Sequence, residues 1–145
     1  MNRPILFYGF LFSALFLGSC GEEVRRGTDI LPDLALIDSV DILFFRELEN
    51  QRFYTYVSTS DPAVIRPLQV NCGTAIIDND NCKKEGKIYC YRRGNIITTL
   101  YYGYKDDSCS FLRFIKNGEL YSMRLEEGFI RQLDGLKETA VEPGN

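Results

Sequence analysis

The dipeptide Asn117-Gly118 is the feature that most constrains the fold of this chain, because it lies between two strand-like runs over residues 109–116 and 119–125. Asn-Gly is the preferred centre of a two-residue type I′ turn, which joins antiparallel strands. Such a turn pairs Lys116 with Glu119 and fixes which side chains share a face. The sequence therefore predicts a hairpin with a core face formed by Leu112, Phe114, Tyr121 and Met123. The opposite face is mixed and carries Phe111, Arg113, Ile115, Leu120, Ser122 and Arg124.

Other strand-like runs precede this hairpin. Residues 40–45 and 52–57 are rich in β-branched and aromatic residues, and the polar segment between them predicts a first hairpin. Residues 87–92 and 96–104 are separated by Arg93-Gly94-Asn95, a turn sequence. Together with the Asn117-Gly118 hairpin, these two runs predict an antiparallel meander of about four strands.

Two short helices complete the prediction. Asp61-Pro62 supplies an N-cap and a proline at the first helical position, and helical spacing follows at Val64, Ile65, Leu68 and Cys72. Pro67 shortens or kinks this helix, because proline cannot donate a backbone hydrogen bond. The second helix begins at Glu126-Glu127, where acidic residues favour the helix dipole, and its apolar stripe is Phe129, Ile130, Leu133 and Leu136. The predicted fold is α+β, with element order ββαββββα.

The N-terminus has the pattern of a processing segment. Arg3 precedes an apolar run over residues 5–17, which is too short for a relaxed bilayer span, and the run ends in Leu17-Gly18-Ser19-Cys20. These residues resemble the signal peptide and lipobox of bacterial lipoproteins. The resemblance implies cleavage before Cys20 and attachment of lipid to that residue, palmitate included. The alternative is an ordinary signal peptide that is cut elsewhere and leaves Cys20 as an odd thiol.

The residues after Cys20 bear on location and domain plan. Gly21 occupies the position after the cysteine, where lipoproteins retained in the inner membrane typically have an aspartate. Glu22-Glu23 is similar to an acidic tag that some Gram-negative groups use for surface export. The resemblance thus implies a lipid-anchored outer-membrane protein, on either the cell-surface or the periplasmic face. The remaining length fits one domain. The plan is a signal peptide at 1–19, a lipidated cysteine and polar tether at 20–32, one α+β domain at 33–137 and a tail at 138–145.

Four cysteines remain beside Cys20, and in an exported domain they predict two disulfides. A zinc site is the competing interpretation, but the chain has no C-x-x-C pair and no histidine. The predicted turns put Cys90 and Cys109 at opposite ends of the sheet, on the order of 20 Å apart, whereas a disulfide needs Cα atoms within about 7 Å. We prefer Cys72–Cys109 with Cys82–Cys90, and Cys72–Cys90 with Cys82–Cys109 is left as the other possibility.

Composition narrows the function. The absence of histidine excludes Ser-His-Asp, Cys-His and histidine-ligated metal chemistry. The full chain has a net charge of −3, and removing residues 1–19 takes away one basic residue, Arg3, to give −4, which does not favour nucleic acid. Residues 78–81, Asp-Asn-Asp-Asn, begin like a calcium loop, but Cys82 replaces the third ligand. We therefore expect a protein without cofactor, metal site or enzymatic activity.

Aromatic and basic residues in the predicted meander form a candidate binding surface: Tyr89, Tyr91, Tyr101, Tyr102, Tyr104, Arg92 and Arg93. Tyrosine and arginine are enriched in binding hot spots, and tyrosine stacks on sugars. Aromatic residues are also favoured in strands for packing reasons alone. Two functions are predicted from this surface. The first is a protein-interaction module, which resembles in general design the envelope lipoproteins that act as inhibitors or immunity proteins. The second is a glycan or small-ligand binder.

Overall fold

The structure is a computed structural model that describes residues 21, 23–78 and 81–144. The lipobox, including Cys20, lies outside the described residues, as do Asn79 and Asp80 of the loop that begins like a calcium site. No helix within the described ranges has the length and hydrophobicity needed to cross a bilayer.

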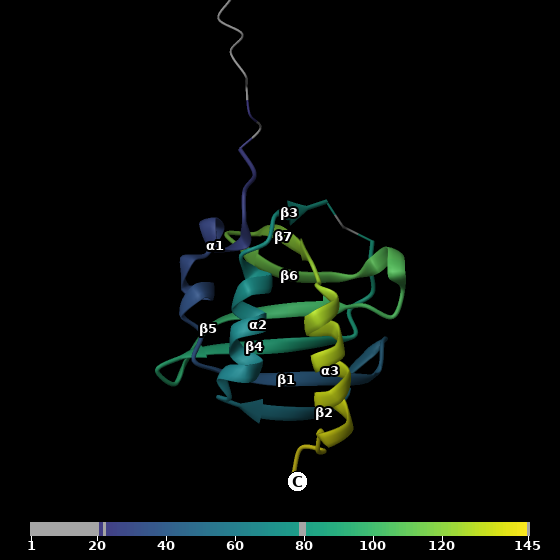
Figure 1. The fold of residues 1–145 in the computed structure, drawn as a ribbon. Coiled ribbons are helices and arrows are strands. Elements are labelled where there is room, and N and C mark those ends of the chain that lie inside the picture. The colour runs from purple at the N-terminus through teal and green to yellow at the C-terminus, as the bar shows by residue number, and fades with distance from the viewer. Residues whose placement is uncertain (1–20, 22, 79–80, 145) are drawn as a thin grey trace, which may run out of the picture.

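A single seven-stranded sheet organises the domain, in the order β2-β1-β4-β5-β6-β7-β3, and all neighbouring strands are antiparallel (Figure 1). The strands are β1 (Ser39–Glu47), β2 (Asn50–Thr59), β3 (Ile76–Ile77), β4 (Gly86–Arg92), β5 (Asn95–Gly103), β6 (Phe111–Lys116) and β7 (Glu119–Arg124). The α+β class is confirmed. The predicted order is incomplete, because it omits β3 and the short helices, and the run from β4 to β7 continues into the first hairpin through the β1–β4 pair.

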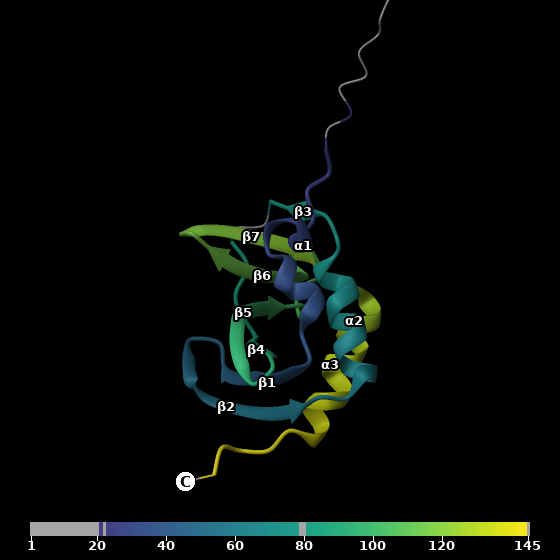
Figure 2. The ribbon, with the colours of Figure 1, turned by 90° about the vertical axis from the view of Figure 1, so that its left-hand side faces the viewer.

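Two helices, α2 (Pro62–Cys72) and α3 (Glu127–Thr139), cross one face of this sheet (Figures 1 and 2). Three shorter segments accompany them: α1 (Gly27–Ile30), the 3₁₀ turn η1 (Pro32–Leu36) and the 3₁₀ turn η2 (Asp107–Cys109). The core lies between the helices and the sheet. Its buried side chains alternate along the strands with those of the opposite face, and they include Val40, Ile42, Phe44, Ile88, Leu100 and Leu112.

The turn chemistry was predicted correctly. Asn117 and Gly118 both have positive φ, at 54° and 80°, as a type I′ turn requires. The pairs Lys116↔Glu119, Phe114↔Tyr121 and Leu112↔Met123 are those expected from the two-residue turn. On the mixed face, Phe111, Arg113 and Ser122 are buried, while Ile115, Leu120 and Arg124 are exposed.

Pro67 lies inside α2 without ending it. The proline leaves the carbonyl of Ala63, four residues earlier, without its helical donor. Gln132 of α3 compensates, because its Nε2 donates a hydrogen bond of 2.6 Å to that carbonyl. Asn71 of α2, which is buried, makes a second link: its Nδ2 donates to the carbonyl of Arg124 and its Oδ1 accepts from the backbone N–H of Glu126, both at 2.9 Å. The two helices are thus joined through polar side chains that supply missing backbone partners.

The predicted tether over residues 20–32 is too long, because its second half belongs to the domain. Gly27 and Ile30 are buried, and a Cβ on Gly27 would collide with Met123 of β7. The carbonyl of Arg25 accepts a 2.8 Å hydrogen bond from the N–H of Ile76 in β3. The polar residues of the first half obscured the packing of the second half, where Ile30 belongs to the core and Leu31 packs against it. At the other end α3 continues to Thr139, and the segment after it pairs with β2.

The preferred disulfide pairing, Cys72–Cys109 with Cys82–Cys90, is wrong. Cys82 is bonded to Cys109, with 5.4 Å between their Cα atoms. The loop before β4 and the loop after β5 meet at one end of the sheet, because Gly86 pairs with Tyr102, and these loops carry the two bonded cysteines. Cys72 and Cys90 are free thiols, both buried in the core between α2 and β4.

Candidate functional site

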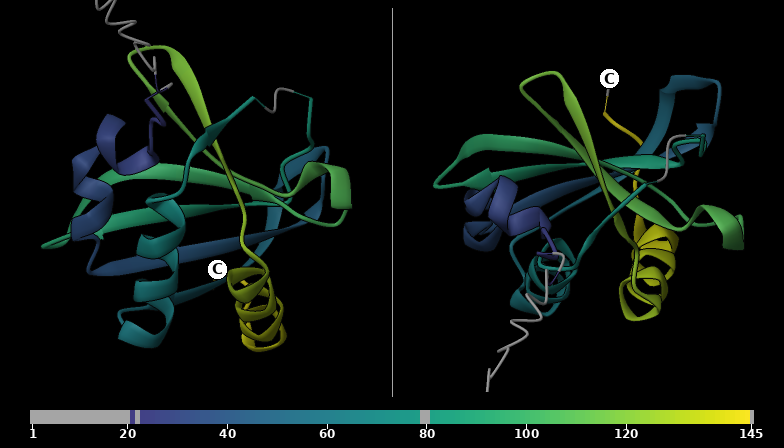
Figure 3. Two further views of the ribbon diagram at one scale, coloured as in Figure 1. Left: turned by 45° about the horizontal axis from the view of Figure 1, so that its top comes forward. Right: turned by 90° about the horizontal axis from the view of Figure 1, so that it is seen from above.

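The face of the sheet opposite the helices, here called the open face, is left uncovered by any helix of the described residues (Figures 2 and 3). Only loops and the C-terminal segment reach this side, and the segment rises past β2 in the view from above (Figure 3). Because side chains alternate along a strand, every second side chain of each strand lies on the open face. Residues paired across strands share a face, so Leu43 lies there with its partners Tyr56 and Lys87.

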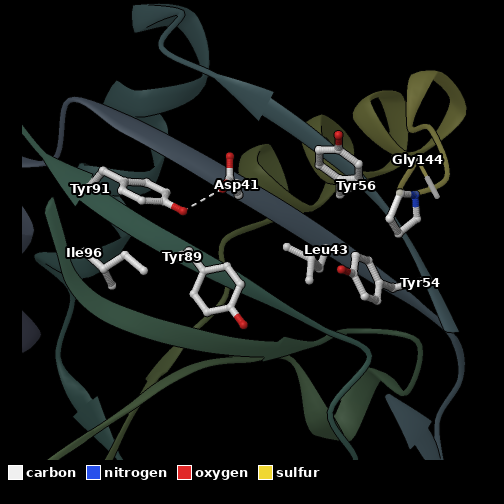
Figure 4. Close-up of a pocket in the computed structure, with 9 residues that line it drawn as sticks. Asp41, Leu43, Tyr54, Tyr56, Tyr89, Tyr91, Ile96 and Gly144 are labelled. Carbon is white, nitrogen blue, oxygen red and sulfur yellow. Dashed lines mark hydrogen bonds between the residues drawn. The ribbon is translucent and has the colours of Figure 1, made fainter. Parts of the chain in front are cut away.

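Four tyrosines from two strands surround a hollow on the open face. Tyr54 and Tyr56 come from β2, and Tyr89 and Tyr91 come from β4, with β1 between them (Figure 4). The two strands are two strand spacings, or about 10 Å, apart. Asp41 and Leu43 of β1 lie along the middle. The hollow has a volume of about 350 Å³, and we call it the tyrosine groove: Asp41, Leu43, Tyr54, Tyr56, Tyr89 and Tyr91. Its remaining lining residues are Ile96, Pro143 and Gly144.

The floor and the rings differ in exposure. Leu43 is only 4% exposed, whereas all four tyrosines are partly accessible. A ligand in the groove would therefore contact aromatic rings first and reach the aliphatic side chain beneath them. This arrangement offers a large apolar surface with hydroxyl groups at its rim.

Asp41 is the acidic residue of the groove, and both of its carboxylate oxygens accept hydrogen bonds. Tyr91 donates to Oδ2 at 2.7 Å (Figure 4), and Ser58 donates to Oδ1 at 2.5 Å. The hydrogen bond to Asp41 is the main cause that raises the pKa of Tyr91 to about 12. Tyr91 is therefore neutral at physiological pH and holds the carboxylate in place.

Basic side chains lie beside the groove. The Lys87 ammonium is 4.8 Å from the centre of the Tyr89 ring, and the Lys84 ammonium is 4.1 Å from the centre of the Tyr101 ring. Farther along the sheet, on β6, the buried Arg113 stacks over Phe111 at 4.3 Å and donates from Nε to the hydroxyl of Ser122 at 3.0 Å. A cation over an aromatic face is attracted to the ring and holds its orientation. The surface next to Tyr89 and Tyr101 is thus aromatic and positively charged.

The structure brings together three of the seven predicted binding residues, Tyr89, Tyr91 and Tyr101, on the open face. Tyr102 is 1% exposed and lies in the core, where burial raises its pKa. Tyr104 donates to Asp134 of α3 at 2.8 Å, and burial is the main cause of its raised pKa.

The two predicted arginines lie away from the groove. Arg92 forms an ion pair of 2.9 Å with Asp33, and Arg93 occupies the β4–β5 turn with φ 51°. Neither contributes to the groove lining.

Sequence reasoning missed four of the six residues that define the tyrosine groove, including both tyrosines of β2. Tyr54 and Tyr56 were assigned to a strand, but their shared face was not connected with that of Tyr89. The signal was present in the alternation of residues 52–57, which puts both tyrosines on one side and Phe53 on the other. The pairing of β1 with β4, which places the two tyrosine pairs on either side of Asp41, could not be read from local pattern.

No cluster of three or more potential metal ligands occurs within residues 21, 23–78 and 81–144. No protein family model, curated protein sequence or solved structure matches this chain. The function of the tyrosine groove is therefore inferred from its own residues and geometry.

Proposed function

We propose that this protein is a lipid-anchored binding module of the bacterial outer membrane, and that its tyrosine groove is the contact surface for another protein. The observation that carries the proposal is the set of four partly exposed tyrosines, from two strands, around an apolar floor on the open face. The membrane anchor rests on the resemblance of residues 17–20 to a lipobox.

Aromatic exposure on this scale favours a binding role over a packing role. Tyrosine supplies a large contact area for little loss of conformational freedom, and it is enriched at the centres of protein interfaces. The open face, which carries Tyr54 and Tyr89, is not covered by any helix of the described residues, although two helices cover the other face (Figure 2). A side chain or short extended segment of a partner fits a hollow of about 350 Å³.

The chemistry of the groove supports a non-enzymatic role. Carboxylate-based hydrolysis of glycosides uses two carboxyl groups on either side of the scissile bond. The groove lining contains one carboxylate, Asp41, and both of its oxygens are held by hydroxyl groups. Such a carboxylate is suited to accepting a further hydrogen bond from a ligand.

A glycan is the second candidate ligand. It is favoured by the combination of the Tyr89 and Tyr91 rings with the Asp41 acceptor beside them. Aromatic rings stack on the apolar faces of sugars, while a carboxylate accepts hydrogen bonds from sugar hydroxyls.

A capture experiment tests the proposal. The bait is oxidised protein from Gly21 onward, which keeps every element of the fold, and the sample is envelope extract and culture supernatant from the native organism. We expect a stoichiometric protein partner that is lost with the double variant Tyr54→Ala and Tyr89→Ala. Phe53→Ala is the matched control, since Phe53 is 55% exposed on the same strand but lies on the other face.

Two results would contradict the protein-binding proposal. One is capture that is unchanged in the double tyrosine variant. The other is absence of any protein partner together with binding of a glycan on an array, lost in the same variant, which would establish the second candidate instead.

A further inference from the structure

The outer edge of β2 is the long free edge of the sheet. β2 is the first strand of the sheet order, so one side of its backbone faces away from β1. In an antiparallel strand every second residue directs its N–H and C=O outward. Tyr56 is one of these residues, because its N–H and C=O bond outside the sheet, and alternation adds Tyr54 and Ser58 to the same set.

The chain's own C-terminal segment shows how this edge can be used. Tyr56 donates its N–H to the carbonyl of Val141 at 2.9 Å and accepts from the N–H of Val141 at 3.0 Å. These two bonds form an isolated antiparallel bridge. Beside it, Glu142 forms an ion pair with Arg46, and the next two residues, Pro143 and Gly144, line the tyrosine groove.

Pro143 prevents this pairing from extending. In the antiparallel register set by Tyr56 and Val141, the position opposite Tyr54 is residue 143. Proline has no N–H, so it cannot donate to the carbonyl of Tyr54. Within the described residues, the segment therefore occupies one pairing position of the edge, at Tyr56.

We propose that the outer edge of β2 is a docking site for an extended segment of a partner protein, which displaces the C-terminal segment and adds an antiparallel strand to the sheet. The inference rests on the proposed function in taking the partner to be a protein. It adds where the partner binds and in what conformation.

The geometry also defines the segment that fits. A non-proline residue opposite Tyr54 can both donate its N–H to the carbonyl of Tyr54 and accept a hydrogen bond from the N–H of Tyr54. Pro143 can only accept. Side chains opposite Tyr54 and Tyr56 lie on the open face, next to the tyrosine groove, as the lining position of Pro143 shows. An acidic residue at the position of Glu142 pairs with Arg46. Main-chain bonds thus supply affinity and the groove supplies selectivity, as in other cases of strand addition.

The test uses a released edge and a defined probe. Val141→Pro, in protein from Gly21 onward, removes the N–H that bonds Tyr56, and Ala140 already has the extended ψ of 138° that a following proline requires. Val141→Ala keeps the N–H and is the control. The probe is a synthetic peptide of residues 139–145 that carries Pro143→Val.

We expect the probe to shift the backbone amide resonances of Tyr54, Tyr56 and Ser58 and to bind the Val141→Pro variant at least about fivefold more tightly than the Val141→Ala control. Methylating the probe's backbone nitrogen at the position of residue 143 should weaken its binding to both variants, since it removes the donor to Tyr54. Unchanged β2 amides in the released variant would overturn the inference. Equal binding of the methylated probe would also overturn it, as would a released edge that pairs only with a second copy of the protein in sedimentation analysis.

The outcomes separate this inference from the proposed function. If the captured partner needs the tyrosines but the probe does not bind the β2 edge, the docking inference fails and the proposed function stands. If the probe docks on β2 while capture is independent of Tyr54 and Tyr89, the proposed role of the groove fails instead.

Discussion

The hydroxyl of Tyr102 donates a hydrogen bond of 2.9 Å to the backbone carbonyl of Leu43, although strand β4 lies between their strands. The ring reaches that carbonyl by passing over Gly86 of β4. A Cβ at Gly86 would collide with both the Tyr102 ring and the Leu43 carbonyl. The absence of a side chain at one position thus lets three strands be tied together under the floor of the tyrosine groove.

Gly86→Ala should lower the free energy of unfolding by about 2 to 3 kcal/mol, because the methyl group displaces a buried ring in a packed core. The measurement is urea denaturation. Gly135→Ala, in the middle of α3 with open space around it, is the control and should stabilise by up to about 1 kcal/mol. Equal stability of Gly86→Ala and wild type would contradict the role given to Gly86.

Replacing both Cys82 and Cys109 by serine should lower the free energy of unfolding by about 3 kcal/mol, since the bond closes a loop over a sequence separation of 27 residues. Wild-type protein from Gly21 onward should show two alkylatable thiols when unfolded without reductant, and none when folded. Burial protects Cys72 and Cys90, and it raises the pKa of Cys72 to about 12. Four thiols in the unfolded protein would refute the Cys82–Cys109 bond.

Tyr91 should make stability depend on alkaline pH. Its pKa is raised from 10.0 to about 12 in the folded protein, chiefly by the hydrogen bond to Asp41. A raised pKa favours the folded state below pH 10, and this contribution is lost as the pH rises from 10 through about 12. The stability difference between wild type and Tyr91→Phe should shrink over that window. Asp41→Asn should lower the pKa of Tyr91 in a tyrosinate absorbance titration, and an unchanged titration would contradict the assignment.

The proposed lipid anchor predicts a simple fractionation result. Cys20→Ala in the full chain should abolish labelling by palmitate and release the protein from the membrane fraction, because the cysteine that the lipobox marks for lipid attachment is removed. Cys109→Ser keeps Cys20 and should stay in the membrane fraction. A Cys20→Ala protein that is still processed and membrane-bound would contradict the lipobox interpretation.

Local pattern was sufficient where the chemistry of a few neighbouring residues decides the structure. Asn117-Gly118 fixed a turn and the register of the strands around it, and Asp61-Pro62 marked the start of α2. The α+β class followed from the spacing of such signals.

The predictions failed where contacts between segments far apart in the sequence determine the structure. The bonding of Cys82 to Cys109 depends on two loops meeting at one end of the sheet, and the groove depends on β1 pairing with β4. Tyr101 and Tyr102 are neighbouring residues of the same type, but strand alternation places Tyr101 on the open face and Tyr102 in the core. Asn71 and Gln132 gave no sequence signal, because the backbone groups that they satisfy belong to other elements.

The chain enters the domain at the β3–β7 edge, so the proposed anchor at Cys20 lies near that edge. Arg25 is hydrogen-bonded to β3 and lies five positions after Cys20, a reach of at most about 18 Å. β2 is six strand spacings, or about 29 Å, from β3 across the sheet. A lipid at Cys20 would therefore anchor the domain at its β3 edge. The opposite edge of the sheet, with the tyrosine groove and the outer edge of β2, would then point away from the bilayer. In that orientation the width of the sheet would separate the proposed contact surface from the membrane.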